Sequence, residues 1–126
     1  MTGQDAFSGG SAEDKWSALF VGLDEAKRNT DFDELAVARV TALLASVRLV
    51  QPFDWMAWRA PHPTDAQIER LSLADCVRHI TRIVRAERFG EGSVASAVGS
   101  GYLLALCRTA HRLSGGDVVS PLAELN

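Results

Sequence analysis

Apolar residues recur along most of this chain at the three- and four-residue spacing of α-helices, and no segment alternates between apolar and polar residues as a strand does. The clearest stripe is formed by residues at i, i+3, i+4 and i+7, namely Trp16, Leu19, Phe20 and Leu23. Ser11 and Asp14 precede this stripe in the pattern of a helix N-cap. The spacing therefore predicts a first helix over residues 11–28 in an all-α protein.

The same signals predict four further helices. A second helix begins at the acidic run Asp31-Phe-Asp-Glu34 and ends by Gln51, because Pro52 disfavours a helical conformation in the residue before it. The remaining helices are predicted at residues 64–71, 72–89 and 93–113. Gly99 and Gly101 fall inside the last of them, where each glycine costs roughly 1 kcal/mol against alanine, so we expect them to permit the close approach of another backbone.

The expected architecture is a small single-domain helical bundle with four main helices and one or two short ones, over residues 11–114. Residues 1–10 are rich in Gly and Ser and are expected to form a flexible leader, with residues 115–126 as a C-terminal tail. A chain of 126 residues buries enough surface to fold without disulfides, metals or an obligatory partner. No cofactor is expected.

Charge and targeting signals narrow the classes of function. The 13 basic and 16 acidic residues give a net charge of −3, which argues against nucleic acid and anionic lipid as partners. The start of the chain lacks the basic and apolar regions of a secretory signal, and no apolar run is long enough to span a membrane. Cys76 and Cys107 have no metal-ligand spacing, so we expect reduced thiols in a cytoplasmic protein without a metal site.

A polar cluster marks the end of the helix predicted at residues 72–89. On a helical wheel Glu87 falls inside the apolar arc, which is formed by Leu73, Val77, Ile80, Ile83 and Val84. Taking an unpaired carboxylate out of water costs several kcal/mol, so we expect Glu87 to pair with a guanidinium, and Arg88 is the first candidate. Arg85 and Glu91 flank the same turn and complete the cluster.

Two tryptophans are expected to cover this cluster. Trp55 and Trp58 lie in the proline-rich connection 52–63, three residues apart, and large aromatic side chains are seldom left in solvent. Two interpretations stay open. The charges either tie the turn to neighbouring helices as an ion network, or they line a ligand pocket whose walls are the two indoles. A helix that ended before Glu87 would remove the basis of both.

Several common chemistries have no counterpart in the sequence. There is no phosphate-binding glycine loop, and Gly99-Ser-Gly101 lacks the context of a serine-hydrolase elbow. His62, His79 and His111 share no metal-ligand spacing, and His79 lies off the apolar arc of its helix, where we expect it to be solvated.

The turn itself resembles the signature of a bacterial family of small helical domains of unknown function. Arg85-Ala-Glu-Arg-Phe-Gly-Glu-Gly92 is similar to the R-x-[DE]-R-F-x-[DE]-G pattern of that family, and Phe53-Asp-Trp-Met-Ala-Trp58 is similar to its upstream tryptophan segment. The resemblance covers residues 50–110. It implies a helical fold and no particular reaction.

Two functional hypotheses follow. The first is a non-enzymatic module that self-associates or binds a protein partner, with the cluster as part of its architecture. The second is a small-molecule binding protein or enzyme, in which Arg85 and Arg88 hold an anionic ligand and Glu87 or Glu91 acts as a base.

Overall fold

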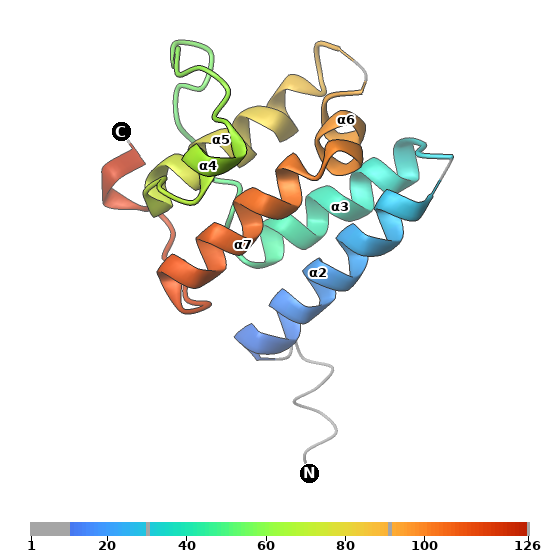
Figure 1. Cartoon of the computed structure of the whole chain (residues 1–126), viewed down its shortest axis with the longest axis horizontal. Coiled ribbons are helices and arrows are strands. Elements are labelled where there is room, and N and C mark those ends of the chain that lie inside the picture. The colour runs from blue at the N-terminus through green and yellow to red at the C-terminus, as the bar shows by residue number, and fades with distance from the viewer. Residues whose placement is uncertain (1–10, 30, 91, 126) are drawn as a thin grey trace.

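The structure, a computed structural model, describes residues 11–29, 31–90 and 92–125. The leader predicted at residues 1–10 lies outside this range. The described residues form α-helices and one 3-10 turn, without strands, which confirms the predicted all-α class (Figure 1). The elements are α2 (Ala12–Arg28), α3 (Glu34–Ser46), α4 (Asp65–Ile68), α5 (Leu73–Ala86), α6 (Ser93–Ser100), α7 (Tyr102–Ser114) and η1 (Ala123–Leu125).

Side-chain caps start two of the long helices where the sequence predicts them. At the start of α2 the backbone N–H of Asp14 donates to Ser11 Oγ at 3.1 Å, and the Asp14 carboxylate accepts from the Ser11 N–H. At the start of α5 the N–H of Asp75 donates to Ser72 Oγ at 3.1 Å. These bonds satisfy N–H groups that have no partner within the helix.

The predicted last helix is two helices, which corrects the sequence prediction. The chain turns at Gly101, whose φ of 84° lies in the left-handed region that favours glycine. This residue ends α6 and begins α7. A Cβ added at Gly99 or Gly101 would meet nothing within 4 Å, so neither glycine accommodates a neighbouring backbone. The need for a left-handed residue explains Gly101, and nothing in the structure explains Gly99.

Helix α3 also ends earlier than its predicted limit. It stops at Ser46, and Arg48 adopts a φ of 63° as the chain turns away. Gln51 therefore lies beyond the helix, with 1% of its surface exposed, and its side chain binds the backbone of the C-terminal segment. Its Nε2 donates to the carbonyl of Val119 at 2.8 Å, and its Oε1 accepts from the N–H of Leu122 at 2.9 Å.

The bundle is built from two helix pairs, α2 against α3 and α5 against α7, with α6 contacting both pairs (Figure 1). The core between them is apolar and includes Trp16, Leu19, Leu44, Ile80, Val94, Leu103 and Leu106. The C-terminal segment joins this core through Val118, Leu122 and Leu125, and η1 lies against α5. Residues 115–125 therefore pack as part of the bundle.

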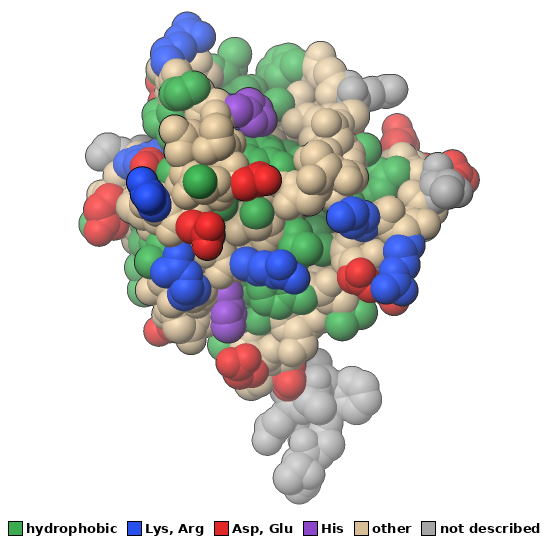
Figure 2. Space-filling model, viewed as in Figure 1, with side chains coloured by type: hydrophobic (Ala, Val, Ile, Leu, Met, Phe, Trp, Pro, Cys, Tyr) green, Lys and Arg blue, Asp and Glu red, His purple; other side chains and the backbone are tan. Residues whose placement is uncertain are grey.

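The surface mixes both signs of charge. On the face shown in Figure 2, acidic and basic side chains are interspersed around apolar patches, so this face has no broad field of one sign. Over the described ranges, no helix combines the length and apolar character needed to cross a bilayer.

Candidate functional site

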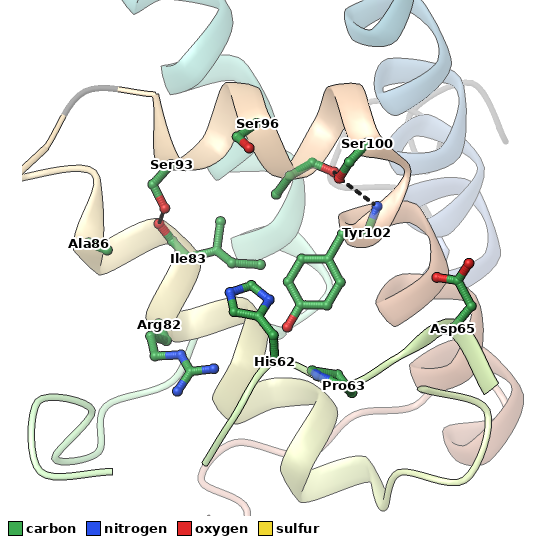
Figure 3. Close-up of a pocket in the computed structure, with 11 residues that line it drawn as sticks. His62, Pro63, Asp65, Arg82, Ile83, Ala86, Ser93, Ser96, Ser100 and Tyr102 are labelled. Carbon is green, nitrogen blue, oxygen red and sulfur yellow. Dashed lines mark hydrogen bonds between the residues drawn. The ribbon is translucent and has the colours of Figure 1, made fainter. Parts of the chain in front are cut away.

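A cleft of about 610 Å³ lies between α5, α6, the start of α7 and the segment that leads into α4 (Figure 3). Ile83, Ala86 and Ala97 supply apolar surface. The polar side chains that line the cleft are His62, Asp65, Arg82, Ser93, Ser96, Ser100 and Tyr102. We call this site the Arg82 cleft.

Local sequence signals place these side chains. His62 stands between Pro61 and Pro63, and proline restricts both its own φ and the residue before it, so this segment is extended and borders the cleft. The turn at Gly101 makes Tyr102 the first residue of α7. The spacing of three and four residues puts three hydroxyls on the cleft side of α6, those of Ser93, Ser96 and Ser100.

Arg82 is held on three sides. Its Nη1 donates to the carbonyl of Ala60 at 2.8 Å, and its Nη2 donates to Nδ1 of His79 at 3.0 Å. Its Cζ lies 4.6 Å from the centroid of the Trp58 ring, in cation–π contact. All three partners are neutral groups, so the guanidinium is fixed without being neutralised.

His79 is buried, with 3% of its surface exposed, and the prediction that it is solvated was wrong. The connection that carries Trp58 folds over the polar side of α5, and the indole lies 4.6 Å from the imidazole between ring centroids. A helical wheel does not represent such a covering segment. Burial, as the largest cause, together with the charges of Arg82 and His62 lowers the pKa of His79 to about 4, against the opposing effect of Asp75.

The hydrogen bonds fix the tautomer of this histidine. A guanidinium can only donate, so Nδ1 of His79 is the unprotonated nitrogen. The hydroxyl of Tyr102 lies 3.3 Å from the same nitrogen, and its oxygen accepts a hydrogen bond from Arg82, because a guanidinium can only donate. Burial raises the pKa of Tyr102, and the charge of Arg82 opposes this rise. The ring of His62 lies 4.9 Å from the Tyr102 ring, which gives the cleft an aromatic wall.

The two tryptophans do not form a common roof over the predicted cluster. Trp58 packs on His79, Phe53 and Arg82, behind the Arg82 cleft. Trp55 lies against Phe89, with 6.0 Å between ring centroids. Through Arg82, Trp58 contacts a residue that lines this cleft.

Glu87 has a partner, but the partner is not the predicted guanidinium. The half-buried carboxylate accepts from the backbone N–H of Val94 at 2.9 Å and of Gly92 at 3.3 Å. These donors belong to the start of α6, which has no capping side chain of its own because its N-cap residue is a glycine. Glu87 is therefore a distant cap of α6, favoured also by the positive end of the helix dipole.

The rest of the predicted cluster does not form an ion network with this carboxylate. In the described part of the chain, no ion pair joins Arg85 or Arg88 to Glu87. Arg88 is exposed, and with Glu87 it lines a separate hollow of about 560 Å³ beside the start of α3. Glu91, the fourth predicted member, lies outside the described residues.

The two cysteines are not among the residues that line the cleft. Cys76 and Cys107 are buried thiols, and burial raises the pKa of both, that of Cys76 to about 11. Such thiols are poor nucleophiles. Within residues 11–29, 31–90 and 92–125, no three His, Cys, Asp or Glu side chains are grouped as metal ligands.

Sequence reasoning missed the residues that the structure brings together most closely, namely His62, His79, Arg82 and Tyr102. One local signal was available: His79 and Arg82 are three residues apart, which places them on one face of α5. The approach of Tyr102 and His62 depends on tertiary packing, and no spacing along the chain encodes it.

Residues 26–116 match a family described as a family of unknown function, DUF6508. The matched span runs from the end of α2 to just beyond α7 and contains every residue of the Arg82 cleft. Neither a curated protein nor a solved structure matches the chain. Because the match covers more than half of its 126 residues, this chain belongs to the DUF6508 family of unknown function.

Proposed function

We propose that this protein binds a small molecule in the Arg82 cleft. The supporting observation is the convergence of polar groups from four segments of the chain on one hollow of about 610 Å³. Small-molecule sites typically combine a concave, partly apolar surface with a few fixed polar groups. The cleft has apolar surface from Ile83 and Ala97, ring surface from His62 and Tyr102, and a fixed cation in Arg82.

This site differs in position from the pocket expected at Trp55 and Trp58. In this proposal Trp58 positions Arg82 through its cation–π contact, and Glu87 caps α6. We assign no ligand contact to Arg85, Arg88 or Glu91.

The proposal is tested by screening the protein against metabolite and nucleotide panels by thermal shift, with binding located by the backbone amide signals of a ¹⁵N-labelled sample. A ligand at 100 times its Kd adds about 2.7 kcal/mol of stability. We expect at least one compound to stabilise the protein and to shift the amides of residues 62, 82 and 102.

A matched pair of substitutions controls the screen. Ser96→Phe places a ring in the cleft and should abolish binding, whereas Ser17→Phe, at an exposed serine of α2, should leave it unchanged. Hits that survive Ser96→Phe, or a panel without a single hit, would contradict the proposal.

A second candidate function is self-association. Met56 and Phe89 are 61% and 73% exposed, and Phe89 lies beside Trp55. Exposed apolar side chains can bury one another against the same surface of a second copy, so the partner we propose is a second copy of this chain. Sedimentation analysis should show a dimer that Phe89→Ser dissociates, and a monomer at all concentrations would exclude this function.

A further inference from the structure

We infer that the ligand of the Arg82 cleft carries an anionic group, a carboxylate or a phosphate, and that this group docks on the guanidinium of Arg82. The inference deepens the proposed function and rests on it for the identity of the site. It adds the chemical class of the ligand.

The first step is the charge of Arg82. No carboxylate among the described residues pairs with it. Its neighbour one turn earlier on α5, Arg78, pairs with Asp75 at 2.6 Å. Arg82 therefore brings an uncompensated positive charge to the cleft, and a half-buried charge of this kind favours a counter-ion.

The second step is the geometry of the guanidinium. Ala60, His79 and Trp58 use one donor of Nη1, one donor of Nη2 and one face of the plane. The hydroxyl of Tyr102 accepts from a further N–H of Arg82, which leaves two of the five N–H groups of the guanidinium without a partner in the described ranges. Because the guanidinium of Arg82 is already held in place, the binding of a carboxylate or phosphate costs little side-chain entropy. The planar arrangement of its N–H donors matches the oxygens of both anions.

The third step concerns the groups around the guanidinium. His79 occupies one N–H of Nη2 and is uncharged at neutral pH, so it leaves the charge of the guanidinium uncompensated and does not repel an anion. Ser93 donates to the carbonyl of Ile83 and Ser100 to that of Ala97. The hydroxyl of Ser96 has no partner among the described residues, which leaves it able to donate to an anion.

Asp65 is the one acidic side chain of the cleft, and it provides a second test. Figure 3 shows it on the opposite side of Tyr102 from Arg82, so it lowers the local positive potential without touching the guanidinium. Removing its charge should strengthen anion binding, whereas removing the charge of Arg82 should weaken it. Opposite effects of two substitutions in one cleft are specific to an electrostatic site.

The experiment uses small probes in matched pairs, inorganic phosphate against trimethyl phosphate and acetate against acetamide. Binding is followed by the amide signals of residues 62, 82 and 102 and the Nε–H signal of Arg82. We expect only the two anions to bind. Arg82→Gln should weaken their Kd about tenfold, the loss of one charge-assisted hydrogen bond, and Asp65→Asn should tighten it roughly twofold.

Arg78→Gln is the control, since it removes a charge from the same helix outside the cleft and should leave the Kd unchanged. If Arg82→Gln fails to fold, the anion–neutral pairs and Asp65→Asn still decide the question. Neutral probes that bind as well as anions, or an anion affinity equally sensitive to Arg78→Gln, would overturn the inference.

The two proposals fail in different ways. Panel hits at the cleft that are all neutral would overturn the anionic class and leave the proposed function standing. Phosphate or acetate bound at Arg82 with no hit from the panel would support the anion site and contradict the proposed binding of a metabolite or nucleotide in the cleft. If neither panel compounds nor anions shift the cleft amides, both proposals are overturned.

Discussion

Nη2 of Arg82 donates to Nδ1 of His79 at 3.0 Å, and this bond requires His79 to be neutral on that nitrogen. A cation is thus held in place by a base that a lower pH would protonate. Protonation would replace an acceptor by a second donor and set two positive charges side by side, which links the geometry of the cleft to pH.

The first prediction concerns the pH dependence of stability. The pKa of His79 is about 4 in the folded protein and close to its ordinary value of 6.5 when unfolded. The unfolded chain therefore binds more protons between these values, and stability falls as the pH falls from 6.5 towards 4, by about 1.4 kcal/mol per pH unit from this group. Above pH 6.5 the contribution is complete. Urea unfolding at pH 7, 6 and 5 measures it.

His79→Gln provides the control, because the amide oxygen can accept from Arg82 and does not titrate in this range. The variant should lose less stability than the parent protein between pH 7 and pH 5. Parallel losses would show that His79 is not buried in its neutral form.

The second prediction concerns the cap supplied by Glu87. Glu87→Ala leaves the N–H groups of Val94 and Gly92 without their acceptor, and should lower the free energy of unfolding by about 1 kcal/mol. Arg88→Ala, at an exposed position, should change it by less than about 0.5 kcal/mol. Chemical denaturation compares them. Equal costs for the two substitutions would favour the ion pair that the sequence predicts.

The third prediction contrasts two glycines that are two residues apart. Gly101→Ala forces a Cβ into the left-handed region and should destabilise the protein by about 1 kcal/mol. Gly99→Ala, inside α6 with open space around its Cβ, should stabilise it by up to about 1 kcal/mol. Thermal unfolding of both variants gives the comparison, and shifts of the same sign would be incompatible with the described backbone.

The fourth prediction concerns the hold of Gln51 on the C-terminal segment. Gln51→Leu leaves the carbonyls of Arg48 and Val119 and the N–H of Leu122 without partners, at a cost of about 3 kcal/mol. Proteases should then cut faster within residues 115–125. Gln67→Leu, at an exposed helix cap, should cost about 1 kcal/mol or less and leave proteolysis of this segment unchanged.

The helices could be predicted because their determinants are local. Ser11 and Ser72 start helices through residues three positions later, and the apolar stripes give the buried faces. The break at Gly101 was missed because glycine is compatible both with a costly helical interior and with a left-handed turn. The choice between them depends on how α6 and α7 pack.

The sequence predicted the candidate site at the wrong place on the fold for a related reason. The wheel extended the helix to Phe89, whereas α5 ends at Ala86, so Glu87 lies beyond the helix on whose apolar arc it was placed. Its half-buried carboxylate has a partner, but the prediction considered only guanidinium groups and not the uncapped N–H groups of the next helix. It also assigned His79 to solvent because the covering segment that carries Trp58 comes from another part of the chain. Tertiary contacts therefore determine both the partner of Glu87 and the burial of His79.

The turn at Gly101 has a consequence for how the cleft can vary. The serine hydroxyls belong to α6 and the phenol to α7, and one left-handed residue joins the two helices. The dihedral angles of that residue set how far apart these two walls stand. A change in the backbone conformation at this one residue can thus alter the width of the cleft, while every side chain that lines it stays the same.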